Sequence, residues 1–253
     1  MIVCKSPAEI EKMRAASTLV AEVLAELAGM VAAGVSTLDL DMEAERLVRA
    51  AGAEPAFKGY RGYPCTLCAS ANDEVIHGIP SRRPLVEGDI ISLDMGVKQH
   101  GFFGDSAITV PVGRVSEQAQ LLLRVTQESL EKGIAQVRLG GRVSDIGHAI
   151  QQHVEAHGFS VVREFVGHGI GASLHEDPQI ANYGEPGRGP RLAEGMTLAI
   201  EPMVNVGRPG VKMLADGWTA VTRDGSLSAH FEHTVAVSRN GPVVLTRAAA
   251  SVR

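Results

Sequence analysis

Apolar residues recur at helical spacing in two stretches near the start of the chain. The first stretch predicts a helix over residues 7–33, with Gly34 as its stop. The second predicts a helix that begins after the cap residue Ser36 and ends at Gly52, with Asp39 at its third position. The chain is therefore expected to begin with a pair of helices.

Farther along, the spacing changes from the helical period to alternation. Strands are predicted over residues 90–97 and 105–112, with a turn near His100. The helical period then returns over residues 116–137 and again over residues 143–158. Helix pairs followed by antiparallel strands predict an α+β fold.

Four predicted strands each place one acid on a face with mostly small or polar residues. In the first strand, Ile90, Ser92 and Asp94 share one face, whereas Ile91 and Leu93 share the other. The four acids are Asp94, Asp105, Glu201 and Glu232, the last on a strand expected to carry His230 and Thr234 on the same face. The apolar faces should lie under the helices, and the acid faces should form a cavity floor.

The second half of the chain repeats the first at matching spacings. The repeated features are Gly34 and Gly52 against Gly140 and Gly158, His77-Gly-Ile against His168-Gly-Ile, Glu87-Gly88 against Glu194-Gly195, and Asp94 against Glu201. Such self-similarity predicts two related halves, about residues 7–112 and 116–237, that face each other across an approximate two-fold axis. Together they are expected to form a single catalytic domain over residues 1–253.

Composition narrows the classes of protein to which the chain can belong. Its 253 residues are 45% hydrophobic, which is enough for the core of one large domain. A net charge of −5 without a run of Lys or Arg disfavours nucleic acid and acidic membranes as partners. The absence of an apolar signal region indicates a soluble cytoplasmic protein. The three cysteines Cys4, Cys65 and Cys68 are an odd number, which disfavours a disulfide framework.

The four acids and His168 form a set of candidate metal ligands. Carboxylate and imidazole groups suit divalent Mn, Fe, Co or Zn better than a thiolate-bound structural ion. Four carboxylates on one cavity floor would repel, because two charges about 4 Å apart cost about 4 kcal/mol at an effective dielectric near 20. Two divalent ions would neutralise all four, and a water held between them would become an acidic nucleophile.

These residues, with several further motifs, resemble the type I methionine aminopeptidases over nearly the whole chain. The motifs are Gly62-Tyr63-Pro64, Asn72, His77-Gly-Ile-Pro80, Asp94 with Asp105, Glu164-Phe-Val-Gly-His-Gly-Ile-Gly171, His175-Glu-Asp-Pro, Ile200-Glu-Pro-Met and Phe231-Glu-His-Thr. The resemblance implies the pita-bread fold, in which paired helices pack on a curved antiparallel sheet around a central metal site. It also implies removal of the N-terminal methionine from nascent proteins and peptides, with preference for a small second residue.

The resemblance also implies a role for each metal ligand. Asp94 would chelate one ion, His168 and Glu201 would chelate the other, and Asp105 and Glu232 would bridge the two. The two divalent ions could be Co, Mn, Fe, Zn or Ni, since availability as well as affinity selects the metal. A monovalent cation is further expected near Asn72 and Ser228.

Catalytic and substrate-binding roles are implied in the same way. His175 would hydrogen-bond the scissile carbonyl, His77 would contact the peptide nitrogen on the leaving side, and Glu201 would shuttle a proton. The pocket for the first residue is expected to comprise Tyr60, Tyr63, Cys68, Leu174 and Trp218, with His77 and His175 beside it. The enzyme is expected to act as a monomer on nascent chains that begin with Met, and contact with the ribosome is left open.

Two positions depart from the family pattern. Met95-Gly96 stands where many members have a valine and a threonine, and this removes a hydroxyl beside the ligand Asp94. Leu174 stands where an aromatic residue often precedes the second histidine. Metal affinity is expected to depend on the first change, and pocket width on the second.

Two other functions compete with this one. An X-Pro aminopeptidase or prolidase shares the catalytic fold, but usually has a separate N-terminal domain, for which little chain precedes residue 7, and often a histidine where Glu164 stands. A metal-free binding protein on the same fold has no reason to keep all five ligands. The ligand set therefore favours the peptidase.

Overall fold

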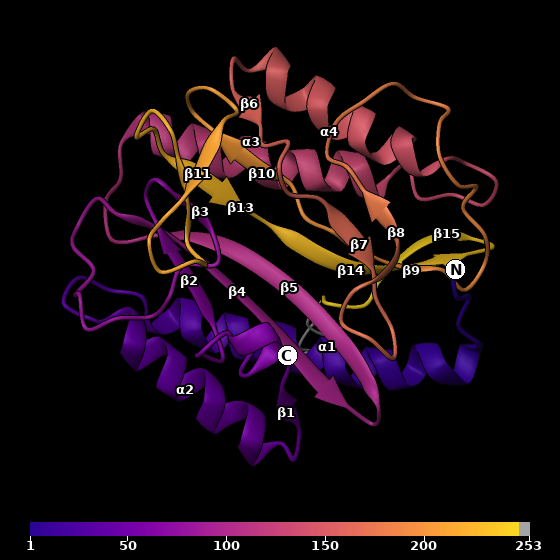
Figure 1. Ribbon diagram of the computed structural model, residues 1–253, viewed down its shortest axis with the longest axis horizontal. Coiled ribbons are helices and arrows are strands. Elements are labelled where there is room, and N and C mark those ends of the chain that lie inside the picture. The colour runs from indigo at the N-terminus through magenta and orange to yellow at the C-terminus, as the bar shows by residue number, and fades with distance from the viewer. Residues whose placement is uncertain (248–253) are drawn as a thin grey trace, which may run out of the picture.

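Two pairs of helices flank a curved sheet in the computed structural model of the chain, which describes residues 1–247 (Figure 1). The first pair is α1 (Pro7–Met30) with α2 (Thr37–Ala50), and the second is α3 (Glu117–Ile134) with α4 (Val143–Ala156). The expected α+β class is confirmed. None of the helices within residues 1–247 combines the length and the apolar character needed to span a membrane.

The helix starts follow from local hydrogen bonds. The hydroxyl of Ser36 accepts from the Asp39 amide at 3.2 Å, and the Asp39 carboxylate accepts from the Ser36 amide at 3.0 Å. Ser6 and Glu9 form the same arrangement at the start of α1. Two otherwise unpaired amides are thereby satisfied at each start, which is why these helices begin where the sequence predicts.

The first helix ends three residues earlier than predicted. Its C-cap Val31 has an extended backbone (φ −64°, ψ 112°), and the Gly34 amide donates to the Leu85 carbonyl at 2.8 Å. That non-local hydrogen bond turns the chain toward the sheet before the apolar spacing stops. The third helix likewise ends at Ile134 rather than at residue 137, with Val137 buried outside the helix.

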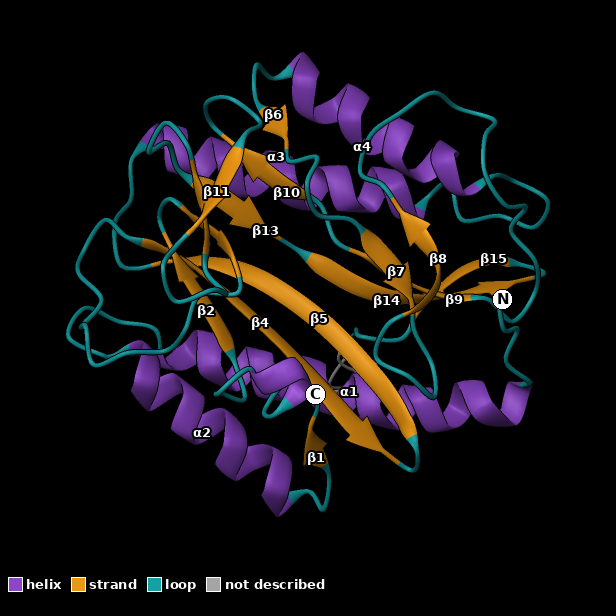
Figure 2. Cartoon of the chain, viewed as in Figure 1, coloured by secondary structure: helices purple, strands orange, loops and turns teal. Residues whose placement is uncertain are grey.

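The main sheet is antiparallel and, within the described residues, has nine strands (Figure 2). Its path is β1 (Glu54–Pro55), β4 (Ile90–Gln99), β5 (Phe102–Pro111), β14 (Glu232–Ser238), β9 (Thr197–Ile200), β7 (Gly167–Gly169) and β8 (Glu176–Ile180), while β2 (Cys68–Ala71) pairs with β4 and β15 (Gly241–Val244) with β14. The long strands β4 and β5 belong to the first half, and β14 and β9 belong to the second. The two halves therefore meet where β5 pairs with β14.

Two small sheets lie beside the main one. The first is β13 (Ser228–His230), β10 (Met203–Asn205) and β6 (Ser160–Val161), and the second is β11 (Val211–Met213), β12 (Ala220–Thr222) and β3 (Glu74–Ile76). A 3-10 turn, η1 (Tyr60–Gly62), lies between β1 and β2 in the chain. The prediction of one strand through His230 and Glu232 is wrong, because β13 and β14 belong to different sheets. At the break, the Phe231 amide donates to the carbonyl of Pro202, which has no amide of its own to continue a ladder.

Each helix pair buries the apolar face of its own half of the sheet. Ile91 and Leu93 of β4 pack with Val20, Leu24 and Leu40 of α1 and α2. A second core cluster joins α3 and α4 to β9 and β14. The alternation in β4 therefore points Asp94 away from the helices, as the sequence predicts.

Matching positions in the two halves form matching hydrogen bonds. The Gly34 and Gly140 amides donate to the carbonyls of Leu85 and Leu192 at 2.8 and 2.9 Å, and the Gly88 and Gly195 amides donate to the carbonyls of Val112 and Val237 at 3.0 Å each. This agreement supports the repeat, whereas the single-domain interpretation of residues 1–253 stays a prediction.

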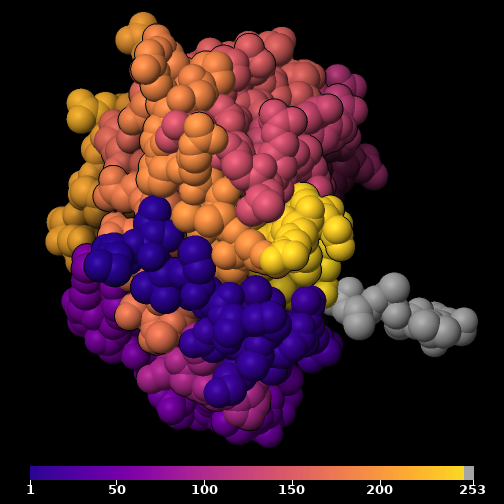
Figure 3. Space-filling view, turned by 90° about the vertical axis from the view of Figure 1, so that its right-hand side faces the viewer, coloured from indigo at the N-terminus to yellow at the C-terminus, as the bar shows by residue number. Residues whose placement is uncertain are grey.

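The N-terminal residues, in indigo, cross to the second half, in orange (Figure 3), where the Lys5 amide donates to the Gly195 carbonyl at 2.7 Å.

Gly140 offers a test of the backbone at these turns. Its φ is +81°, and no atom of the described residues lies within 4 Å of where a Cβ would stand, so Gly140→Ala should cost only the left-handed backbone, about 1 to 2 kcal/mol. Gly29→Ala is the matched control, because Gly29 is helical and has equally open space. The control should gain about 0.5 to 1 kcal/mol in urea unfolding. Equal effects of the two substitutions would contradict this account.

Candidate metal centre

Strand register brings the four acids onto one face of the main sheet. Asp94 lies opposite Ala107 across β4 and β5, and Ala107 lies opposite Glu232 across β5 and β14. Asp105 is two residues from Ala107 and so shares its face. Because His233 lies opposite Ile200, Glu232 stands next to Glu201, which directly follows β9.

His168 reaches the same face from β7. It lies opposite Ala199, which is two residues before Glu201 on β9. Its Nδ1 donates to the Gly169 carbonyl at 2.8 Å, so in the neutral ring Nε2 carries the free lone pair. That nitrogen lies 3.5 Å from Oε1 of Glu201 and 4.0 Å from Oδ2 of Asp105. The lone pair therefore points at carboxylates, as a metal ligand requires.

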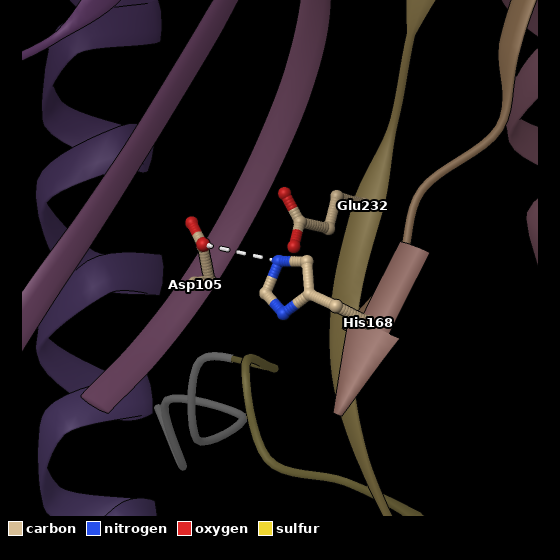
Figure 4. A group of neighbouring side chains, drawn as sticks. All are labelled: Asp105, His168 and Glu232. Carbon is tan, nitrogen blue, oxygen red and sulfur yellow. Dashed lines mark ion pairs between the residues drawn. The ribbon is translucent and has the colours of Figure 1, made fainter. Parts of the chain in front are cut away.

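Three of these side chains form the tightest group (Figure 4). Ligand atoms of Asp105, His168 and Glu232 all lie within 4.8 Å of one another, and all three residues are buried. Glu201 adjoins them through His168, and Asp94 lines the same cavity. The structure thus brings all five predicted ligands together.

Burial dominates the electrostatics of this face. It raises the pKa of Asp105 from 3.8 to about 7. Burial, followed by the charges of the neighbouring acids, also raises the pKa of Asp94, Glu201 and Glu232 well above the usual range. Burial and the nearby His175 lower the pKa of His168 to about 4, so its imidazole is neutral at pH 7. The acids therefore resist ionisation together unless a cation joins them.

The donor atoms fit divalent cations. One carboxylate oxygen each of Asp94, Asp105 and Glu232 is buried and accepts no hydrogen bond from any residue between 1 and 247. A buried acceptor without a partner is costly and commonly indicates a bound ion or water. Oxygen donors with one imidazole match the preferences of divalent Mn, Fe, Co and Zn.

Side-chain hydroxyls hold the junction on which the ligands lie. β5 and β14 share only the pairs Ala107 with Glu232 and Ser106 with His233. The Thr234 hydroxyl donates to the Asp105 carbonyl at 2.8 Å, and the Ser106 hydroxyl donates to the Glu232 carbonyl at 2.6 Å. The sequence pattern placed Thr234 on the acid face but predicted no role for it or for Ser106, although hydroxyl residues directly beside the acids were a usable signal.

A cavity opens beside the acids. Its lining is Phe57, Tyr60, Arg61, Tyr63, Cys68, His77, Asp94, Asp105, His168, Leu174, His175, Glu201, Trp218 and Glu232. All twelve predicted metal, catalytic and pocket residues are among them. Phe57 and Arg61 were missed, and the glycines around the turn at Tyr60, Gly59 and Gly62, both with positive φ, were the available signal.

Comparison with known proteins agrees with this geometry. Residues 11–239 match the profile of metallopeptidase family M24. The chain belongs to metallopeptidase family M24. It is 54% identical to "Methionine aminopeptidase 1" of Bacillus subtilis (strain 168), over 98% of this chain and 100% of that protein. It is 53% identical to "Methionine aminopeptidase" of Clostridium perfringens, over 97% of this chain and 99% of that one.

Two solved structures show the same fold. The methionine aminopeptidase of Thermotoga maritima superposes with a TM-score of 0.96 at 48% identity, covering 98% of this chain and 100% of that one. The prolidase of Pyrococcus furiosus superposes with a TM-score of 0.79 at 21% identity, covering 98% of this chain and 66% of that one. The pita-bread fold is therefore confirmed, and the second likeness concerns the fold alone.

The two positions at which this M24 chain departs from the family pattern, Met95-Gly96 and Leu174, both lie at the cavity wall or beside it. A Cβ on Gly96 would lie 2.8 Å from a ring carbon of Phe57 and 3.0 Å from Cβ of Ala56, so glycine leaves room for the Phe57 ring at the cavity. Leu174 is buried and packs with Met13 and Ile170 while also lining the cavity. The cavity wall and the α1 core therefore share one side chain.

The expected monovalent cation site stays a prediction. The Asn72 side chain donates to Asp89 at 2.8 Å and accepts from the Ile90 amide at 3.1 Å, and the Ser228 amide donates to the Asn72 carbonyl at 2.8 Å. Cys4, Cys65 and Cys68 are free thiols in the structure.

Asp105→Asn tests the electrostatics of the M24 site. In metal-free protein, Asp105 is protonated in both the folded and the unfolded state below about pH 4, and between about pH 4 and pH 7 it ionises only in the unfolded state. Above pH 7 the buried acid therefore costs up to about 4 kcal/mol of stability. Metal-free Asp105→Asn should therefore melt above wild type at pH 8 and gain less at pH 4. With saturating Mn²⁺ the order should reverse, because wild type keeps the better ligand. The same order with and without Mn²⁺ would contradict the assignment.

Proposed function

We propose that this protein is a dinuclear-metal aminopeptidase of the type I class that removes N-terminal methionine from nascent proteins and peptides. The observation that carries the proposal is one buried face with four acids and His168 that opens on a cavity lined by aromatic and thiol side chains. Relatives named methionine aminopeptidase, similar over the full chain, support it. We further propose action in the cytoplasm as a monomer, with any ribosome contact left open.

In this proposal, Asp94, Asp105, His168, Glu201 and Glu232 hold two divalent ions. When bound, such ions polarise the scissile carbonyl and lower the pKa of water so that it attacks at neutral pH. Co, Mn, Fe, Zn and Ni all suit the donor set, and a monovalent cation near Asn72 and Ser228 is also proposed. The surrounding side chains then position the peptide and move its protons.

Glu201 is the proposed proton shuttle. Its carboxyl group is buried, and burial and the neighbouring acids raise its pKa well above the usual range. With metal bound this carboxyl would be ionised, and a carboxylate within reach of the attacking water can accept its proton and return it to the leaving amine. Its Oε1 lies 3.5 Å from His168, at the edge of the cavity where both transfers would occur.

His175 is the proposed hydrogen-bond donor to the scissile carbonyl. Its Nδ1 lies 2.9 Å from the Tyr60 hydroxyl, and its ring centroid lies 4.2 Å from that of His168. When the Tyr60 hydroxyl donates to Nδ1, the hydrogen of the neutral ring is on Nε2. Burial, followed by the positive charge of Arg61, lowers the pKa of His175 and keeps the ring neutral. A neutral donor then stabilises the oxyanion as it develops.

His77 is proposed to contact the peptide nitrogen of the leaving product. Its backbone has φ +60°, a conformation that non-glycine residues rarely adopt and that is common at functional sites. Its ring stands edge-on to Phe165 at 5.8 Å and to Trp218 at 6.4 Å, between centroids. Burial lowers its pKa to about 4, so the ring can accept or donate without carrying charge.

The pocket beside these residues suits a methionine side chain. The Tyr63 hydroxyl lies 3.0 Å from the carbonyls of both Leu67 and Gly78 and its single hydrogen is donated to this pair, so the ring rather than the hydroxyl is left for a ligand. Trp218 packs edge-on to Tyr63 at 5.2 Å. A thioether gains about 0.3 to 1.5 kcal/mol against an aromatic ring, and the remaining walls, Tyr60, Cys68 and Leu174, are apolar or weakly polar.

Substrate selectivity tests the proposal. After chelation and addition of Mn²⁺ or Co²⁺, we expect Met-Ala-Ser to be cleaved and an X-Pro peptide to be spared. Met-Lys-Ser should be poor, and Leu-Ala-Ser should lose about 10- to 200-fold in kcat/KM, since a misfit of about one methylene costs about 1 to 3 kcal/mol. Preference for the X-Pro peptide would favour a prolidase. Full activity after chelation would contradict the metal role.

His175→Ala tests the donor role separately. Loss of an oxyanion donor should lower kcat for Met-Ala-Ser by about 100- to 1000-fold, with KM changed less. Metal content should stay at the wild-type value, because His175 is not among the proposed ligands. Loss of metal from this variant would instead make His175 a ligand.

A further inference from the structure

Lys5 has a buried side chain, which is rare for a lysine. Its ammonium Nζ lies 2.5 Å from Oε2 of Glu176 and 3.1 Å from the Val3 carbonyl. The two side chains of the ion pair are only 3% and 13% exposed. The other lysine and arginine ion pairs among residues 1–247 are much more exposed, so this pair is unusual in its burial.

Two glycines fix the path of the chain around Lys5. A Cβ on Gly195 would collide with the Lys5 backbone, and a Cβ on Gly171 would collide with the Lys5 side chain and with Oε1 of Glu176. The Lys5 amide also donates to the Gly195 carbonyl at 2.7 Å. This contact joins the indigo N-terminal segment to the second half in Figure 3. Lys5 is thus held from both sides, independently of its charge.

Glu176 directly follows His175 and organises the loop that carries it. Oε1 of Glu176 accepts from the Ser173 amide at 3.1 Å, while Oε2 takes the Lys5 ammonium. At the start of the loop, the Gly171 carbonyl accepts from the Phe103 amide at 2.8 Å. One carboxylate therefore ties the start of β8 to Ser173 in the middle of the loop that precedes it, with His175 next to it.

We propose that Lys5 is a positioning residue for catalysis, acting through Glu176 on the loop of His175. The buried ion pair holds the loop so that the His175 ring stays against Tyr60 and His168, where the proposed function needs it. The inference rests on that proposed function. The N-terminal segment thereby contributes to the active site although no atom of Lys5 lines the cavity.

Lys5→Met tests the inference directly. Well below its melting temperature, this variant should lose about 10- to 100-fold in kcat on Met-Ala-Ser, because a loop displaced by about 1 Å misplaces the donor. KM and metal content should remain near wild type. Lys5→Arg, which keeps the charge, should restore part of the loss. An unchanged kcat together with a lower melting temperature would overturn the proposal and leave Lys5 a purely structural role.

Neighbouring carboxylates provide a matched pair of variants if Lys5→Met fails to fold. Glu176→Gln keeps the size of the side chain but removes its charge, and it should lower kcat as Lys5→Met does. Asp177→Asn is the control, because Asp177 is on the same strand but its side chain is 59% exposed. Equal kcat values for these two variants would overturn the proposal.

A double-mutant cycle identifies the residue through which Lys5 acts. If Lys5 works through His175, adding Lys5→Met to His175→Ala should cause little further loss of kcat. Independent, multiplicative losses would overturn the proposed route. Inactive wild-type protein would refute the proposed function itself. Active wild-type protein, together with independent losses of kcat in the two single variants, would refute only the role of Lys5.

Discussion

Repulsion among four buried carboxyl groups is the constraint on which this structure depends. Two ionised acids about 4 Å apart cost about 4 kcal/mol at an effective dielectric near 20, and a whole domain is stable by only about 5 to 15 kcal/mol. Burial raises the pKa values of Asp94, Asp105, Glu201 and Glu232, and for all but Asp105 the charges of the neighbouring acids raise them further. Divalent ions remove the cost and convert the same face into a centre that activates water.

The doubled architecture explains how so many acids reach one place. The first half supplies Asp94 and Asp105 from β4 and β5, and the second supplies the remaining ligands from β7, β9 and β14. Within the main sheet, over residues 1–247, the halves join through a ladder of only two residue pairs, with the hydroxyls of Ser106 and Thr234 closing the junction. The helices cover the opposite face, which leaves the acid face free for the cavity.

Local rules and alternation account for the parts that sequence could predict. Ser36 and Asp39 start a helix through contacts three residues apart, and the apolar side of β4 follows from a period of two. The helix end at Met30 and the break at Phe231 could not be read in this way. Each depends on a hydrogen bond to a distant carbonyl, that of Leu85 or Pro202.

The residues of the candidate site likewise divide into those that sequence motifs predict and those that only tertiary contacts reveal. His168 and the acids were predictable because their motifs carry the resemblance to a known family. Arg61 enters the cavity through a turn with φ +49°, and Lys5 meets a partner 171 residues away. The glycines beside Arg61 indicate a turn but not its place at the cavity, and no local pattern indicates the role of Lys5, because each role arises from tertiary contact.

Proton release on metal binding tests the central claim most directly. Metal-free protein at pH 6 should keep protons on the buried acids, since burial raises the pKa of Asp105 to about 7 and the pKa of Glu201 well above its usual range. Titration with Mn²⁺ in a weakly buffered solution should therefore release more than one proton per protein, with two ions bound at saturation. Binding of two ions without proton release would show that the acids were already ionised and would contradict the account.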